Sequence, residues 1–200
     1  MNQIKFHLDR IFNSGTDAKR LDAFRVIMPL AVVVLFSRLP WEVFGDVPAC
    51  VWNPPGMAGI FLPTSLSVSQ ITFLKTSFLV SMVTLSLGLL SRVSSATAAI
   101  CLFLLVGNSI GAHYADRSAN PLILVLAVLS LSPCLGVNYS IDSWLFKKRR
   151  RSDSDSIWPA RLIQFLFFFT FFSAGYIKLN HSGFAWIDTE NIAAKWIWAG

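Results

Sequence analysis

The sequence predicts an all-α integral membrane protein, a bundle of about five transmembrane helices with its N-terminus in the cytoplasm. Hydrophobic residues make up 54% of the 200 residues and charged residues only 14%, whereas ordinary soluble domains carry roughly 25% charged residues. The apolar residues also gather in long blocks, and about 20 such residues match the roughly 30 Å hydrocarbon core of a bilayer. We therefore expect a multi-pass protein of the cell membrane whose first partner is the lipid bilayer.

Five apolar blocks predict the five helices. They cover about residues 23–41, 71–90, 93–112, 121–137 and 157–179. The predicted membrane domain is thus 23–200, and residues 1–22 precede it. Ile4, Leu8, Ile11 and Phe12 recur at helical spacing in this first segment, which is typical of an amphipathic helix on the membrane surface. The final residues, 191–200, resemble the approach to another apolar element, so we expect a chain that is truncated at its C-terminus.

Charged and small residues refine the predicted helices. Arg25 and Arg38 bracket the first block, where long basic side chains can reach the membrane interface. Lys75, one turn into the second block, is expected to reach outward in the same way. In the third block, Gly107 and Gly111 form a GxxxG pair, with Asn108 between them. Such a pair lets two helices approach closely, although one occurrence does not identify a particular contact.

The loop charges predict the orientation. With the N-terminus inside, most basic residues fall on the inner side: Lys5, Arg10, Lys19, Arg20, Arg25, Arg92, Lys147, Lys148, Arg149, Arg150, Arg151 and Arg161. The outer side keeps Arg38, Lys75, Arg117, Lys178 and Lys195. Since cytoplasmic loops carry the excess of Lys and Arg, this distribution places the N-terminus in the cytoplasm and residue 180 outside.

The remaining composition argues against two other classes of partner. The net charge is +6, but the basic residues lie between apolar blocks, where they meet lipid head groups. We therefore expect no nucleic-acid partner. Cys50, Cys101 and Cys134 have neither CxxC nor zinc-site spacing, so the sequence predicts no metal site and no disulfide framework.

Ionisable residues collect at the predicted outer face and supply the candidate catalytic residues. His113 follows the third helix, and Lys178 and His181 follow the fifth. Ionisable groups at a bundle mouth are functional candidates, although loop ends are also where charges are solvated.

Lys178 is the most specific of these candidates. It shares a helical stripe with Gln164, Phe168, Phe171 and Gly175, about 21 Å from Gln164 at 1.5 Å per residue. A desolvated lysine can act as a base. The alternative is a lysine that only reaches for the interface at a helix end.

Several short segments resemble, in order, the vitamin K-dependent gamma-carboxylase-like membrane domain, called HTTM for horizontally transferred transmembrane. They are residues 24–26 (FRV), 120–123 (NPLI), 131–133 (LSP), 139–142 (YSID), 158–164 (WPARLIQ) and 174–179 (AGYIKL), followed by Trp186. The resemblance implies that Lys178 corresponds to the base that starts oxidation of vitamin K hydroquinone in the carboxylase. The sequence departs from the carboxylase at Ile177, where that enzyme has a second lysine, and in the inserted residues 181–185.

The resemblance implies two alternative functions. Short bacterial members of the family include proteins required to mature a secreted peptide toxin of the sporulation-delaying type. The first expectation is therefore an accessory factor in maturation, export or immunity of a secreted peptide, with that peptide or another membrane protein as partner. The second is a carboxylase- or epoxidase-like enzyme that uses Lys178 as a general base. No cofactor motif is evident, and vitamin K hydroquinone is implied by the resemblance alone. A small transporter is disfavoured, because no paired acidic residues occur inside the helices.

Overall fold

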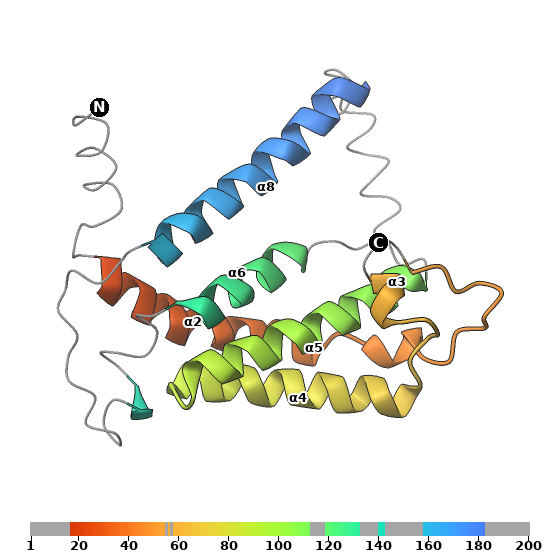
Figure 1. Cartoon of the computed structure of the whole chain (residues 1–200), viewed down its shortest axis with the longest axis horizontal. Helices are drawn as coiled ribbons and strands as arrows, with labels where there is room; N and C mark the ends of the chain where they lie inside the picture. The colour runs from red at the N-terminus through yellow and green to blue at the C-terminus, as the bar shows by residue number, and fades with distance from the viewer. Residues whose placement is uncertain are drawn as a thin grey trace. The chain divides into compact units, whose positions relative to one another are not determined.

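Helices are the regular elements of the part of the chain that the structure describes. The computed structural model describes residues 17–54, 56, 58–112, 119–132, 140–142 and 158–182, without the side chains of residues 17–22, 181 and 182. Every regular element within these ranges is a helix (Figure 1), which confirms the all-α class. The chain divides into two units, Met1–Ile163 and Gln164–Gly200, and each is described by itself.

All five predicted blocks form helices. These are α2 (Asp17–Ser37), α4 (Val68–Leu87), α5 (Ser91–Gly111), α6 (Asn120–Leu131) and α8 (Trp158–Ser182). Two short elements that the sequence did not predict, η1 (Trp41–Phe44) and α3 (Ala58–Phe61), lie between α2 and α4.

Three of the described helices are long and apolar enough to cross a membrane. They are Val68–Leu87, Ser91–Gly111 and Trp158–Asn180. The apolar stretches Ala23–Ser37 and Asn120–Leu131 are shorter, and a helix needs about 20 residues to cross the hydrocarbon core without a tilt or a thinner bilayer. The described residues therefore include three helices of spanning length and two shorter apolar helices.

Prolines explain why the first and fourth helices end earlier than predicted. The first was predicted over 23–41, but α2 runs from Asp17 to Ser37 and Pro40 follows it. The fourth was predicted to reach residue 137, but α6 ends at Leu131, and Ser132 before Pro133 is extended with ψ 124°. A residue that precedes proline is pushed out of the helical region. Residues 17–22, predicted to precede the membrane domain, belong to α2, and residues 1–16 lie outside the described part.

Local capping sets both ends of α4. At its start, Ser67 Oγ accepts from the backbone N–H of Gln70, and the Gln70 side chain accepts from the N–H of Ser67. This capping box satisfies two N–H groups that a helix start leaves without partners. At its end, Gly88 is left-handed at φ 75°, and Leu89 donates its N–H to the carbonyl of Thr84. Glycine adopts this conformation without a steric penalty.

The core of the first unit forms around α5, which packs against α4 on one side and α6 on the other (Figure 1). α2 packs against α4. Buried side chains recur at helical spacing along α4 and include Phe78, Met82 and Leu85. The first half of α5 instead buries small residues, among them Ser95, Ala98 and Ala99, so that neighbouring backbones approach closely. Ser95 Oγ donates to the carbonyl of Leu126 at 2.7 Å, which joins α5 to α6.

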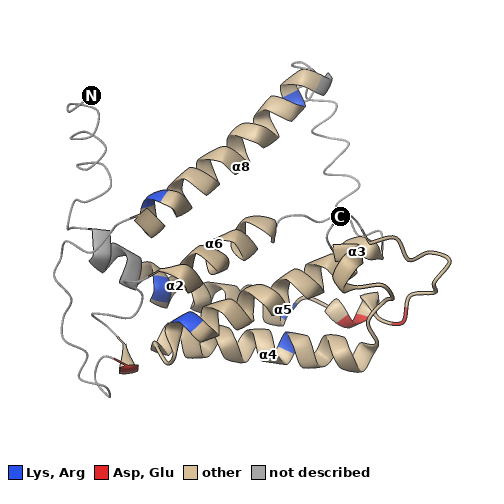
Figure 2. Cartoon of the chain, in the orientation of Figure 1, with Lys and Arg blue, Asp and Glu red and all other residues tan. Residues whose placement is uncertain are grey.

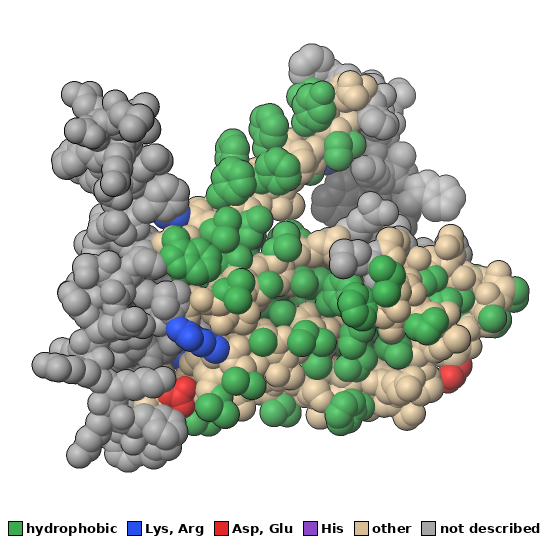
Figure 3. Space-filling model, viewed as in Figure 1, with side chains coloured by type: hydrophobic (Ala, Val, Ile, Leu, Met, Phe, Trp, Pro, Cys, Tyr) green, Lys and Arg blue, Asp and Glu red, His purple; other side chains and the backbone are tan. Residues whose placement is uncertain are grey.

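The outer surface of the bundle is apolar. Figure 3 shows hydrophobic side chains spread over the visible face of the described residues. Ile27, Phe73, Val80 and Ile100 are each more than half exposed. Soluble monomers rarely expose apolar surface on this scale, whereas lipid acyl chains cover such a surface without cost. This arrangement supports the membrane assignment independently of helix length.

The helices alternate in direction, so the first unit has two distinct ends. The N-terminal half of α2, the C-terminus of α4, the N-terminus of α5 and the C-terminus of α6 share one end, as the hydrogen bonds below show. The described acidic residues lie at the two opposite ends (Figure 2). The four helix termini that share one end agree with the alternating helix directions expected from the loop charges. Which end faces the cytoplasm stays a prediction, and the basic loop 147–151 lies outside the described residues.

Substitution of Gly88 by alanine should destabilise the protein more than the same change at Gly56. Both glycines have positive φ, 75° and 54°, but a Cβ at Gly88 would overlap Arg25 and Ser140, whereas nothing lies within 4 Å of one at Gly56. We expect Gly88→Ala to lower the free energy of unfolding by about 2–4 kcal/mol and Gly56→Ala by about 1–2 kcal/mol. Circular dichroism during unfolding in detergent micelles measures both. Equal losses would show that the space around Gly88 does not matter.

Candidate functional site

One end of the bundle contains a fully buried arginine. Arg25 of α2 has a relative exposure of 0%, and its guanidinium Nη1 donates to the carbonyl of Leu85 at 3.2 Å. Leu85 lies in the last turn of α4, where the helix dipole is negative, and its carbonyl also accepts from the N–H of Gly88 at 3.1 Å. The expectation that Arg25 reaches out to the membrane interface was wrong. Its charge is instead held inside the bundle at the C-terminus of a neighbouring helix.

A second arginine repeats this arrangement at the same end. Arg92, in the first turn of α5, donates its Nε–H to the carbonyl of Ser132 at 3.0 Å. Ser132 directly follows Leu131 and is the C-cap of α6. Ser86 adds a link from α4 to α2, because its hydroxyl donates to the carbonyl of Val26 at 3.1 Å. We call Arg25, Leu85, Gly88, Arg92 and Ser132 the arginine end, where two basic side chains bind the carbonyl termini of two helices.

The opposite end is covered by residues 41–66, which we call the cap segment. Asn108, in the last turn of α5 and 1% exposed, joins both ends of this segment. Its side-chain oxygen accepts from the N–H of Leu66 at 2.9 Å, and its side-chain nitrogen donates to the carbonyl of Phe44 at 2.8 Å. Asp46 donates its N–H to the carbonyl of Leu66 at 3.0 Å and so closes the loop. One amide side chain thus fixes where the cap segment begins and ends.

The GxxxG pair on α5 packs against the cap segment. A Cβ at Gly107 would come within 3.1 Å of Ala58 Cβ and 3.2 Å of Leu62 Cδ1. A Cβ at Gly111 would come within 2.7 Å of the Trp52 ring. Trp52 in turn donates its indole N–H to the carbonyl of Leu62 at 3.3 Å. Both glycines are closely approached, but by the segment between α2 and α4 rather than by another of the predicted helices.

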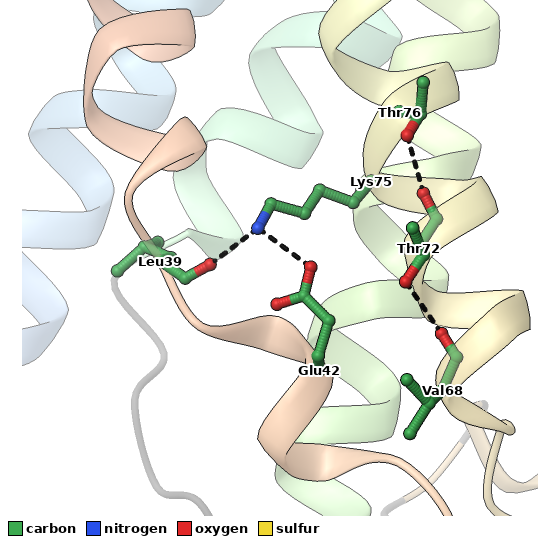
Figure 4. Close-up of polar contacts among 6 residues, drawn as sticks. All are labelled: Leu39, Glu42, Val68, Thr72, Lys75 and Thr76. Atoms are coloured by element: carbon green, nitrogen blue, oxygen red, sulfur yellow. Dashed lines mark hydrogen bonds and ion pairs between the residues drawn. The ribbon is translucent and has the colours of Figure 1, made fainter.

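An ion pair ties α4 to the end of α2. Lys75 Nζ lies 3.0 Å from Glu42 Oε1 and donates to the carbonyl of Leu39 at 3.1 Å (Figure 4). Lys75 therefore extends towards the cap segment, where it meets a carboxylate. That this direction is outward stays a prediction. A hydrogen bond from its own backbone amide, followed by the hydrogen bond and the charge of Lys75, holds the pKa of Glu42 below its ordinary value of 4.5.

Two of the three candidate catalytic residues of the sequence, Lys178 and His181, lie on α8. Lys178 lies in α8, which is helical from Trp158 to Ser182, so the predicted stripe from Gln164 to Lys178 does share one helix face. The Lys178 side chain is exposed. His181 follows one turn later on the same helix, and residues three apart on a helix are neighbours. His113 lies outside the described residues, so its proximity to Lys178 stays a prediction.

Within the described residues, no group of three His, Cys, Asp or Glu side chains could hold a metal ion. Comparison of the chain with protein-family models, with curated proteins and with solved structures found no match. The family resemblance thus rests on the sequence motifs quoted above.

Sequence reasoning missed the functions of Arg25 and Asn108. Each is a polar residue near the end of an apolar block, where exposure to the interface is the usual expectation. A signal for Asn108 was present, because an amide between two closely approached glycines has little access to solvent. For Arg25 the signal was weaker, since its partner is a backbone carbonyl that no sequence pattern reveals.

Replacement of Asn108 by leucine should detach the cap segment. The change keeps a similar side-chain size but leaves the N–H of Leu66 and the carbonyl of Phe44 without their partner. We expect a loss of about 2–4 kcal/mol in unfolding free energy, since each such group costs about 1–3 kcal/mol. Hydrogen exchange should localise the loss to residues 41–66.

Ser109 supplies the matched control for this measurement. It is equally buried, but its hydroxyl bonds only to Val106 of its own helix. Ser109→Ala should therefore cost less than about 1 kcal/mol and leave exchange in the cap segment unchanged. Faster exchange in the cap segment of Ser109→Ala would contradict the assignment to Asn108.

Glu42→Gln should remove a pH-dependent part of the stability. Because the pKa of Glu42 is lowered in the folded state, its contribution is complete above pH 4.5 and is lost as the pH falls through the folded value. For a partly exposed pair we expect about 0.2–1 kcal/mol. Thermal unfolding at pH 7 and at about pH 3.5 measures the difference between wild type and variant. An identical pH dependence in both proteins would rule out this role for Glu42.

Proposed function

We propose that this chain is a multi-pass protein of the cell membrane, of the HTTM type, that acts as an accessory factor in maturation, export or immunity of a secreted peptide. The cap segment is the observation that carries this proposal. It is held in a defined conformation by Asn108, Trp52 and the Glu42–Lys75 pair. On the predicted orientation it lies on the outer face, where a secreted peptide would be met.

The chemistry of the cap segment suits a peptide partner. Residues 41–66 contain no Lys or Arg, and the described part includes Glu42 and Asp46. Val43 and Val51 are 73% and 46% exposed. A surface that combines acidic and apolar side chains favours basic, apolar ligands through charge complementarity and burial. A basic amphipathic peptide fits this description.

Polar side chains that join the elements of the first unit also favour an accessory role. Arg25 and Asn108, which are buried, and Arg92, which is exposed, each bind backbone groups of neighbouring elements. Their described hydrogen bonds hold helix ends and the cap segment in place, which is the work of a scaffold. The alternative is a carboxylase- or epoxidase-like enzyme in which Lys178 removes a proton from vitamin K hydroquinone. It is supported by the AGYIKL motif and by the continuous helix that places Lys178 and Gln164 on one stripe.

Substitution of Lys178 distinguishes the two functions. In the native host, deletion of the gene should abolish production of, or resistance to, the secreted peptide. Both Lys178→Ala and Lys178→Arg should restore it to the wild-type level, because an accessory factor needs no base at this position. The purified protein with vitamin K hydroquinone and oxygen should form no epoxide above a protein-free control.

The opposite results would support the enzyme. Loss of a general base lowers a rate by about 100-fold or more. Epoxide formation by the wild type that falls by this factor in Lys178→Ala would overturn the accessory proposal. Phe168→Ala is the matched control, because it lies on the same stripe and is also exposed, yet it carries no titratable group.

A further inference from the structure

A single stripe of α5 is exposed at one part and contacts the cap segment at another. Ile100, Phe103, Gly107 and Gly111 recur at helical spacing and share one face. Ile100 is 60% exposed. Further along, Phe103 makes an edge-on contact with Phe61 of α3 at a ring distance of 6.0 Å. Gly107 then meets Ala58 and Leu62, so α3 lies alongside the last turns of α5 (Figure 1).

This position corresponds to membrane depth. α5 is long and apolar enough to cross the bilayer, and its 21 residues extend about 31 Å, close to the thickness of the hydrocarbon core. Counted back from Gly111 at about 1.5 Å per residue, Gly107 lies about 6 Å and Phe103 about 12 Å inside this end. The side chains of α3 that touch these residues lie at the same depth.

Several backbone groups near α3 have partners within the protein, as this depth requires. Non-helical backbone is tolerated in the hydrocarbon region only where protein groups provide its hydrogen bonds. Leu62 donates its N–H to the carbonyl of Ala58 at 2.8 Å, and the carbonyl of Leu62 accepts from the Trp52 indole. At the end of the cap segment, the N–H of Leu66 donates to the side-chain oxygen of Asn108. An aqueous loop would not need these internal partners.

The outward side of α3 is apolar and continues the lipid-facing surface of α5. Ala58 and Leu62 are buried against α5, whereas Ile60 and Phe61 are 74% and 59% exposed. Phe61 adjoins this stripe through its contact with Phe103. Two large apolar residues on an isolated turn would be poorly placed in water, but they match the acyl chains that surround a spanning helix.

We propose that α3 is a re-entrant element embedded in the bilayer, with Ile60 and Phe61 in contact with lipid acyl chains. The cap segment then enters the membrane beside α5, turns at α3 and returns to the interface near Leu66. This inference does not depend on the function proposed above, because it concerns the depth of one segment and not the partner of the protein.

Nitroxide accessibility tests the depth of α3. Single cysteines at Ile60 or Phe61, in a background without Cys50, Cys101 and Cys134, carry the spin label in phosphatidylcholine vesicles. Oxygen, which partitions into lipid, and a water-soluble nickel chelate compete as collision partners. We expect labels at 60 and 61 to favour oxygen, as a label at Ile100 should. A separate variant keeps Cys50 as the labelled cysteine. Cys50 is exposed and on this proposal lies in the aqueous part of the cap segment, so its label should favour nickel.

Two outcomes would overturn the proposal. A label at Ile60 that favours nickel as strongly as one at Cys50 would place α3 in water. A label shielded from both reagents would show that protein, such as a second copy of the chain, covers α3.

The unmodified chain provides a second measurement that needs no substitution. A phospholipid with a photoreactive diazirine in its acyl chain should crosslink to the peptide that contains Ile60 and Phe61. Adducts at Ile100 without adducts at residues 60 and 61 would refute the embedded position.

Discussion

The conformation of the cap segment depends on the hydrogen bonds of the Asn108 side-chain amide. A chain that leaves one helix and enters the next must satisfy its peptide groups, and near a bilayer water does not do so. Asn108 offers one donor and one acceptor, and it uses them on Phe44 and Leu66. The two contacts shape the intervening residues into a closed loop. The GxxxG surface, the Trp52 ring and the turn of α3 then pack against a loop whose ends are already fixed.

The arginine end meets the same constraint with charge. Guanidinium groups from α2 and α5 bind carbonyl groups at the C-terminal ends of α4 and α6, where the helix dipole is negative. Burial of a charge is costly unless strong hydrogen bonds compensate for it. A helix C-terminus offers several aligned carbonyl dipoles, so it is a favourable place for this. Arg25 and Arg92, which are among the residues that set the predicted orientation, therefore also hold the helices together.

The sequence predicted the helices well because their signal is local. Apolar blocks identify the five helices, and Pro40 and Pro133 could have corrected the ends of α2 and α6. The cap segment was predicted only as a loop, since its conformation depends on contacts between residues far apart, such as Asn108 with Phe44. The burial of Arg25 was missed for the same reason. Lys178 was placed correctly on a helix stripe, because a stripe depends only on helical period. Its proximity to His113 depends on tertiary structure that lies outside the described residues.

The short connection between α4 and α5 affects how the protein reaches the membrane. Three residues join the two spans, and both Gly88 and Leu90 are left-handed, at φ 75° and 44°. Leucine in this conformation is strained, so the turn forms only when both flanking helices hold it. Each span on its own would leave the turn at the end of a single inserted helix, without the packing that stabilises it. During biosynthesis, α4 and α5 would therefore leave the translocation machinery as one helical hairpin, with Arg25 of the preceding helix ready to bind its turn.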